Sequence, residues 1–90
     1  MSGRPARGGP EEDARATTLA LLDGRAAGAT ICPSEVARAV AAATGTADWR
    51  SGMAAVHVAV DSLVAQGLVR LSWKGEAMPA RDGPYRIGRG

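Results

Sequence analysis

The apolar residues of this chain change their spacing at Gly67, and this change constrains the fold more than any other feature. From about Trp49 to Gln66 the apolar side chains recur at the spacing of one helix face. After Gly67, the residues Val69, Leu71 and Trp73 alternate with polar residues, as in a strand with one buried face. The chain is therefore predicted to join helices to a small C-terminal sheet, with Gly67 ending the last helix.

A first helix is predicted to begin near Pro10 and to stop at Gly28. Proline suits the first helical turn, and the acidic residues 11–13 match the positive end of the helix dipole. The segment 29–31 after it is predicted to be an extended connection, with one brief strand. The apolar stripe of this helix is expected to contain Leu19, Leu22 and Ala26.

A second helix is predicted to begin at Cys32-Pro33 and to end at Gly45. Glu35 stands where the acidic residue of a capping box would reach back to the start of the helix. The residues 46–48 then form a short turn before the third helix. The inward face of the second helix is expected to contain Val36, Val40 and Ala43.

The segment 74–84 contains two glycines and two prolines and is predicted to be a loop. Residues 85–87 alternate again and are expected to pair with the strand 68–73 as a hairpin, which must pack on the helices to be stable. This element order is that of a winged helix. The predicted fold is α+β, mostly α: a flexible tail over residues 1–9, then a single domain over residues 10–90. That domain has a three-helix helix-turn-helix core and a C-terminal β-hairpin wing.

The composition argues against catalysis and against a membrane location. Cys32 is the single cysteine, which excludes an internal disulfide and a cysteine-based zinc site, and no apolar stretch approaches the length of a membrane span. His57 is the single histidine, and no motif for a metal, a cofactor or a small-molecule substrate is present. We therefore expect a cytoplasmic, non-enzymatic protein. Cys32 is interpreted as a buried cap residue rather than as a nucleophile.

Positive charge is concentrated in the C-terminal half of the chain. Residues 49–90 carry six basic and three acidic side chains, whereas residues 11–48 carry three basic and six acidic ones. Basic side chains attract the phosphates of nucleic acids, so the C-terminal half is expected to form any nucleic-acid interface.

The outer face of the third helix is the first candidate interface. In helix-turn-helix proteins this face enters the major groove of DNA. Arg50 could contact a guanine, and Ser51 or His57 could contact a base or a phosphate. The alternative is an ordinary solvated helix face, because Arg50 is its only permanent positive charge and Asp61 opposes it.

The predicted wing is the second candidate. Lys74 and Arg81 flank the loop, and Arg70 lies nearby on the outer face of the preceding strand. These cations could contact phosphates or a minor groove. The alternative, favoured by Glu76 and Asp82 in the same loop, is that the charges only maintain solubility.

The two tryptophans are expected to close the ends of a core that lacks phenylalanine, rather than to stack on bases. Arg38 on the second helix either contacts a phosphate or pairs with Glu35 or Asp48.

The segment 30–40, which contains the motif Ile-Cys-Pro-Ser-Glu-Val-Ala-Arg, resembles the signature of an uncharacterised bacterial family. The resemblance spans roughly residues 12–88 and implies a small winged-helix-like fold without an established activity. The chain departs from the family pattern at His57, where arginine is expected, and at Gly52, where a larger residue is usual. Further matches are Asp48-Trp49-Arg50, Met53, Gly67, Lys74-Gly75 and Gly83-Pro84.

Two functions therefore remain open. The leading hypothesis is a DNA-binding protein, such as a small transcriptional regulator or an accessory factor, that binds double-stranded DNA with the third helix and the wing. The alternative is a module that binds another protein or forms a homodimer without nucleic acid, for which the alanine-rich flanks of the third helix would be suitable.

Overall fold

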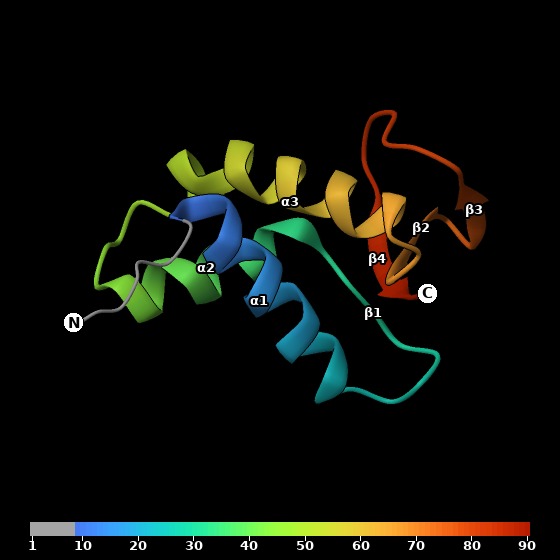
Figure 1. Ribbon diagram of the computed structural model, residues 1–90, viewed down its shortest axis with the longest axis horizontal. Coiled ribbons are helices and arrows are strands. Elements are labelled where there is room, and N and C mark those ends of the chain that lie inside the picture. The colour runs from blue at the N-terminus through green and yellow to red at the C-terminus, as the bar shows by residue number, and fades with distance from the viewer. Residues whose placement is uncertain (1–8) are drawn as a thin grey trace.

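The computed structural model describes residues 9–90, which form three helices and one antiparallel four-stranded sheet (Figure 1). This α+β arrangement has the predicted winged-helix-like layout. Of the predicted N-terminal tail, all residues except Gly9 lie outside the described part of the chain. The elements are α1 (Pro10–Asp23), β1 (Thr30–Ile31), α2 (Pro33–Thr44), the 3-10 turn η1 (Arg50–Gly52), α3 (Met53–Ala65), β2 (Val69–Trp73), β3 (Glu76–Met78) and β4 (Arg86–Arg89).

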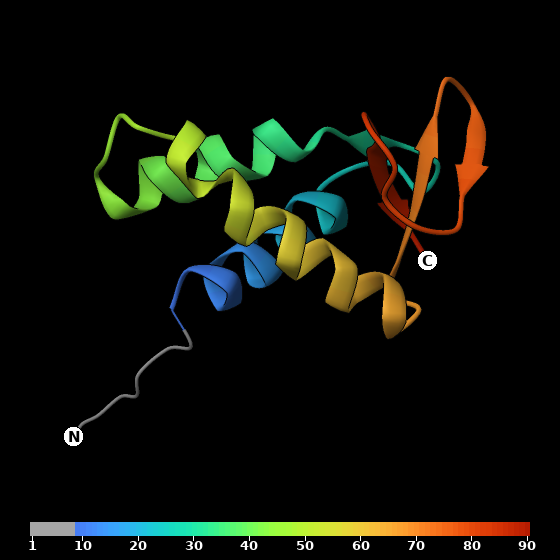
Figure 2. The same cartoon turned by 90° about the horizontal axis from the view of Figure 1, so that it is seen from above.

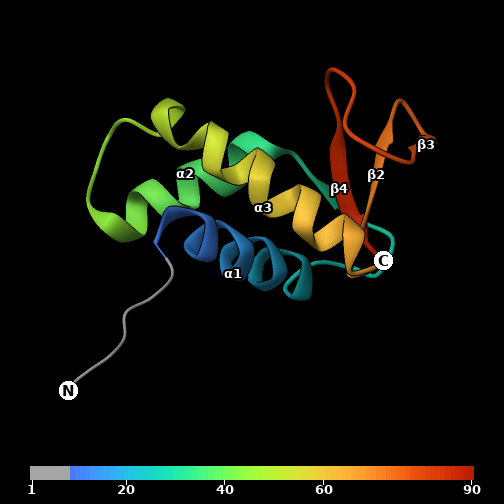
Figure 3. The ribbon, with the colours of Figure 1, turned by 45° about the horizontal axis from the view of Figure 1, so that its top comes forward.

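The three helices pack together, and the sheet stands at the C-terminal end of α3 (Figure 3). The core lies between the helices and the inner face of the sheet, where apolar side chains from every layer meet. Its largest fully buried apolar side chains are Ile31, Val36, Val56, Val60, Leu63, Leu71 and Ile87. No helix within residues 9–90 combines the length and the apolar composition that crossing a membrane requires.

Helix α1 ends at Asp23, so the predicted stop at Gly28 is wrong. The guanidinium of Arg89 donates hydrogen bonds to the carbonyl oxygens of Leu22, Asp23 and Arg25, and these contacts satisfy the end of the helix. Ala26 consequently lies outside the helix and is exposed. The buried stripe consists of Ala14, Thr18 and Leu22.

Helix α2 begins at Pro33 and ends at Gly45, whose φ of 80° is the left-handed cap conformation, as predicted. The capping box is wrong: no side chain caps the start of α2, and Glu35 instead forms an ion pair with Arg25. Ala43 is exposed, contrary to expectation. The buried face of α2 consists of Val36, Ala37 and Ala41.

The predicted third helix begins as the 3-10 turn η1 and continues as α3. Asp48 supports this start, because its Oδ1 accepts a hydrogen bond from the Ser51 backbone N–H at 3.4 Å. Gly67 follows the helix with φ 73°, in agreement with the prediction that it ends this element. Val56, Val60 and Leu63 lie on the buried face of α3, in agreement with the predicted apolar face of this helix.

The sheet has the strand order β1-β4-β2-β3, so the last strand along the chain occupies an interior position. Ile87 of β4 lies opposite Ile31 of β1 on one side and opposite Leu71 of β2 on the other. The predicted pairing of the segment around residues 85–87 with the strand 68–73 is confirmed.

Strand β3 lies in the segment that the sequence predicted to be a loop, and this prediction is wrong. Lys74 and Gly75 form a two-residue turn with φ values of 52° and 84°, and Trp73 pairs with Glu76 directly across it. Positive φ at both central positions is typical of the type I′ hairpin turn, whose twist matches that of the flanking strands. The hairpin of β2 and β3 projects beyond the helices (Figure 2). Trp73 is 40% exposed and does not close the core as expected.

Candidate nucleic-acid interface

Two arginines stack on one tryptophan where α2 meets the start of α3. The guanidinium carbons of Arg38 and Arg50 lie 4.5 and 4.6 Å from the centroid of the Trp49 ring. Trp49 is half-buried and packs against the core, whereas both arginines are exposed. Stacking on the ring holds each guanidinium by a cation–π interaction and leaves its N–H groups available for an anion. We call these three residues the Arg–Trp cluster.

The turn between α2 and η1 builds the Arg–Trp cluster. The hydroxyl of Ser51 donates to the Asp48 carbonyl oxygen at 3.0 Å, and the Asp48 N–H donates to the Thr46 hydroxyl at 3.2 Å. These bonds fix the backbone on both sides of Trp49. Ser51, predicted to contact a base or a phosphate, therefore has its hydroxyl engaged in this turn.

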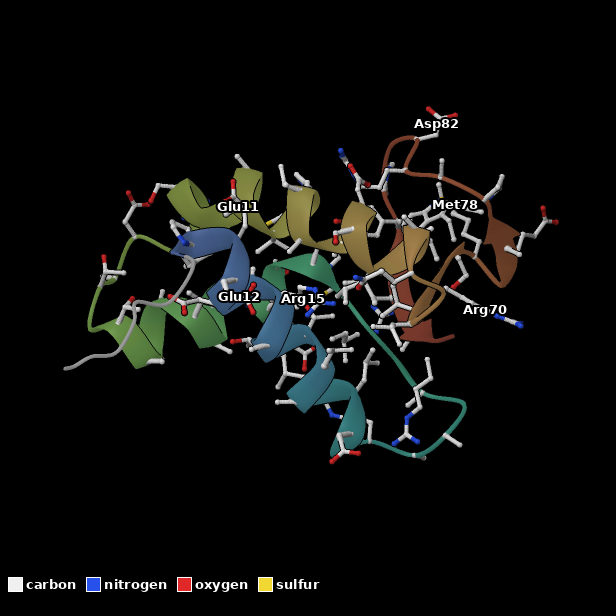
Figure 4. The ribbon with its side chains drawn as sticks, viewed as in Figure 1. Glu11, Glu12, Arg15, Arg70, Met78 and Asp82 are labelled. Carbon is white, nitrogen blue, oxygen red and sulfur yellow. The ribbon has the colours of Figure 1, made fainter. Side chains whose placement is uncertain are left out.

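Arg70 and Lys74 are exposed on the hairpin of β2 and β3. Val69 and Leu71 point into the core, so Arg70 between them points to solvent, and Figure 4 shows it directed away from the body of the protein. Lys74 lies in the hairpin turn. These two residues, the hairpin cations, form a second positive site at the opposite end of α3.

Arg81 does not contribute a free charge. Its Nε and Nη2 donate to the two carboxylate oxygens of Asp61 at 2.7 and 2.9 Å, a bidentate ion pair across the outer face of α3. The hydrogen bond from Arg81 lowers the pKa of the Asp61 carboxyl, so the acid stays ionised. The positive charge of Arg81 is thus compensated.

His57 is half-buried, whereas the sequence placed it on the solvated face of the third helix. Its Nδ1 lies 2.7 Å from the hydroxyl of Tyr85, and burial lowers the pKa of the imidazole. Tyr85 and Arg81 therefore attach the segment 79–85 to α3 at two points one helical turn apart. We call this segment the strap.

The last two arginines have structural contacts. Arg86 donates to the hydroxyl and the carbonyl oxygen of Thr30 at 2.7 and 3.0 Å, which ties β4 to β1. Arg89 caps the end of α1 as described above. These two of the six basic side chains in residues 49–90 therefore make hydrogen bonds within the fold. Among residues 9–90, the basic side chains with neither an ion pair nor a hydrogen bond are Arg38, Arg50, Arg70 and Lys74.

The sequence predicted that Arg38 either contacts a phosphate or pairs with Glu35 or Asp48. Its contact with Trp49 was not predicted. Its stacking contact takes the place of an ion pair with Glu35 or Asp48. Residues 38 and 49 belong to different elements, and only the packing of α2 against η1 brings them together. No local spacing signals such a contact.

Residues 9–90 contain no group of three or more side chains arranged to hold a metal ion. Cys32 is the N-cap residue of α2 but is only half-buried, and its side chain makes no capping hydrogen bond. Its Sγ lies 3.4 Å from the Ser34 hydroxyl, and this hydrogen bond lowers the pKa of the thiol.

The model of a family described as "Protein of unknown function (DUF3253)" matches residues 11–90, nearly the whole chain. No curated protein matches the chain significantly.

Proposed function

The chain belongs to this family of unknown function, and we propose that it binds double-stranded DNA through phosphate contacts at both ends of α3. The observation that carries this proposal is the distribution of the cations that make neither an ion pair nor a hydrogen bond among the described residues. They form two groups: the Arg–Trp cluster at the start of α3 and the hairpin cations beyond its end. Phosphate oxygens are the natural partners of such exposed guanidinium and ammonium groups.

The length of α3 supports this arrangement. Its 13 residues correspond to about 20 Å at the helical rise per residue. The major groove of B-DNA is about 12 Å wide, so a helix of this length reaches past both edges of the groove. Cations at its two ends can therefore contact the two phosphate backbones that border the groove. A winged-helix-like protein that lays α3 across the major groove would use the helix as a spacer between the two groups.

The charge is sufficient for salt-sensitive binding. Each neutralised phosphate releases counterions, and four contacts give a slope of log affinity against log salt of roughly −3.6. Affinity should then fall by roughly 100-fold between about 50 and about 200 mM salt. Binding of this kind suits a small regulator or an accessory factor that acts by occupying DNA.

A protein-binding or dimerisation module is the alternative, and its support is weaker. Within residues 9–90 the exposed large apolar side chains are Val58, Leu68 and Trp73, at 53%, 45% and 40% exposure. They come from three different segments, and single exposed apolar residues are common on monomeric proteins. Size-exclusion chromatography with light scattering tests this alternative directly.

The primary experiment is fluorescence anisotropy of a labelled duplex with the purified protein at about 50 and about 200 mM salt. Binding at low salt that falls steeply at high salt is expected. Arg38→Ala and Arg50→Ala should each weaken binding several-fold and reduce the salt slope by about 0.9. Arg15→Ala is the matched control. Arg15 hydrogen-bonds to Gln66 and lies outside both groups, and its substitution removes the same charge.

Absence of binding at low salt would refute the proposal. Equal losses for Arg15→Ala and Arg50→Ala would also contradict it, because net charge rather than the Arg–Trp cluster would then set the affinity.

A further inference from the structure

Helix α3 carries very few side chains that can read a base. Within Met53–Ala65, only His57 and Ser62 have an N–H or O–H donor, and the helix contains no arginine, lysine, asparagine or glutamine. Direct readout in the major groove depends chiefly on these four missing types, whose donors and acceptors match the base edges. Helix α3, which occupies the position of a recognition helix, therefore lacks the side chains that usually form hydrogen bonds to base edges.

The exposed residues along α3 are short. Ala54, Val58, Ser62 and Ala65 all point to solvent, and three of them have no polar atom. Ala54 and Val58 can offer a thymine methyl group an apolar contact but cannot form a hydrogen bond to a base. Ser62 can bond with more than one base, so it discriminates weakly.

The strap engages the two remaining polar residues of this helix face. His57 has its Nδ1 on the Tyr85 hydroxyl, and both Asp61 carboxylate oxygens accept from Arg81. Asp61 would otherwise be the acceptor for a cytosine amino group. With Nδ1 of His57 and both carboxylate oxygens of Asp61 engaged by the strap, Ser62 is the one polar side chain of α3 that makes no side-chain hydrogen bond.

From these observations we infer that the protein contacts DNA through its sugar–phosphate backbone and does not discriminate base sequence. This inference rests on the proposed function and specifies its partner: duplex DNA as a class, and not an operator. The cations without an ion pair or hydrogen bond lie at the two ends of α3, where the proposed function assigns them, Arg50 included, to phosphates. The middle of the helix offers only Ser62 as a weakly discriminating hydrogen-bonding group.

The test compares duplexes of one length at one salt concentration: alternating A·T, alternating G·C and two unrelated mixed sequences. Dissociation constants within about threefold of one another are expected. A preference of about tenfold or more for one duplex would overturn the inference, because it equals the discrimination of one good base contact. Preference for the A·T duplex alone would point to the thymine methyl contact of Ala54 and Val58 and would overturn it equally.

Ser62→Ala provides the second measurement. The ratio of affinities across the four duplexes should stay unchanged in this variant, whereas a changed ratio would show that Ser62 reads a base. Strong preference with retained binding refutes only this inference, while failure to bind any of the four duplexes refutes the proposed function as well. The two failures are therefore distinguishable.

Discussion

The hydroxyl of Tyr85 lies 2.7 Å from Nδ1 of His57, and the two rings are tilted by 58° with their centroids 5.6 Å apart. This contact joins the end of the strap to the middle of α3 across 28 residues of sequence. Tyr85 is only 4% exposed, so its hydroxyl has left water and depends on this one partner. The strap is therefore held to α3 by this half-buried hydrogen bond and by the exposed ion pair of Arg81 with Asp61, in addition to the packing of the Tyr85 ring in the core.

Tyr85→Phe should lower the free energy of unfolding by about 1 kcal/mol, the net value of a typical hydrogen bond. The substitution keeps the buried ring and removes only the hydroxyl that contacts His57. Urea unfolding followed by tryptophan fluorescence measures the change. The additional substitution His57→Ala should then cost less in Tyr85→Phe than in the wild type, and equal costs would show that the two residues are not coupled.

Tyr85 should remain protonated in the folded protein at a pH where free tyrosine ionises. Burial raises its pKa to about 12, from an ordinary value of 10.0. A raised pKa stabilises the fold fully below pH 10, and this contribution is lost as the pH rises toward 12. Tyr85 is the only tyrosine, so tyrosinate absorbance reports it alone. At about pH 11 the absorbance should rise when urea unfolds the protein, and an absorbance already maximal without urea would contradict the prediction.

His57 should make the fold less stable as the pH falls. Burial, helped by the charge of Arg81, lowers its pKa below 6.5, so the unfolded chain binds a proton more readily than the folded protein. The stabilisation is present above pH 6.5 and is lost as the pH falls through the lowered value. Urea midpoints measured through this range should decline more steeply in the wild type than in His57→Gln. Parallel curves would show that the imidazole does not carry the effect.

Gly67→Ala and Gly52→Ala should have opposite effects on stability. Gly67 has φ 73°, where a side chain costs about 1–2 kcal/mol, although no atom would contact the added Cβ. Gly52 has φ −87° and ψ −5° and equally open surroundings, so alanine there should be neutral or stabilise by about 0.4–1 kcal/mol. Thermal unfolding of both variants tests the pair, and equal shifts in Tm would refute the conformational explanation.

Substitution of Lys74 should weaken DNA binding, whereas removal of the ion pair between Arg81 and Asp61 should not. Lys74→Ala is expected to reduce the salt slope by about 0.9, because it removes one phosphate contact. The double variant Arg81→Ala/Asp61→Asn removes the ion pair without changing the net charge, and its affinity should stay within about twofold of the wild type. A larger loss in the double variant than in Lys74→Ala would place Arg81 at the DNA and contradict the proposed interface.

Local signals in the sequence were sufficient for much of the fold. Gly45 and Gly67 end α2 and α3 because both adopt positive φ, a conformation that glycine tolerates and other residues resist. The change from helical to alternating spacing correctly located β2. Each of these signals depends on a residue and its immediate neighbours, which is why a single sequence reveals them.

Features that depend on distant residues could not be predicted. Helix α1 ends five residues before the predicted stop, at carbonyl groups that accept from Arg89 of the last strand. Likewise, the stacking of Arg38 on Trp49 and the ion pair between Arg81 and Asp61 follow from tertiary packing and not from spacing. Of the predicted site residues, Arg50, Arg70 and Lys74 make no ion pair or hydrogen bond, while Ser51, His57 and Arg81 make hydrogen bonds within the protein.

The interior position of β4 has a consequence for synthesis on the ribosome. Strands β1 and β2 do not pair with each other, and both hydrogen-bond to β4, which is made last. The pairing of β1 with β4 joins Thr30 to Gly88, which are separated by more than half the chain. Such long-range pairings slow folding. The emerging chain can form its helices early, but Ile31 and Leu71 reach their final pairing with Ile87 only after β4 has been made.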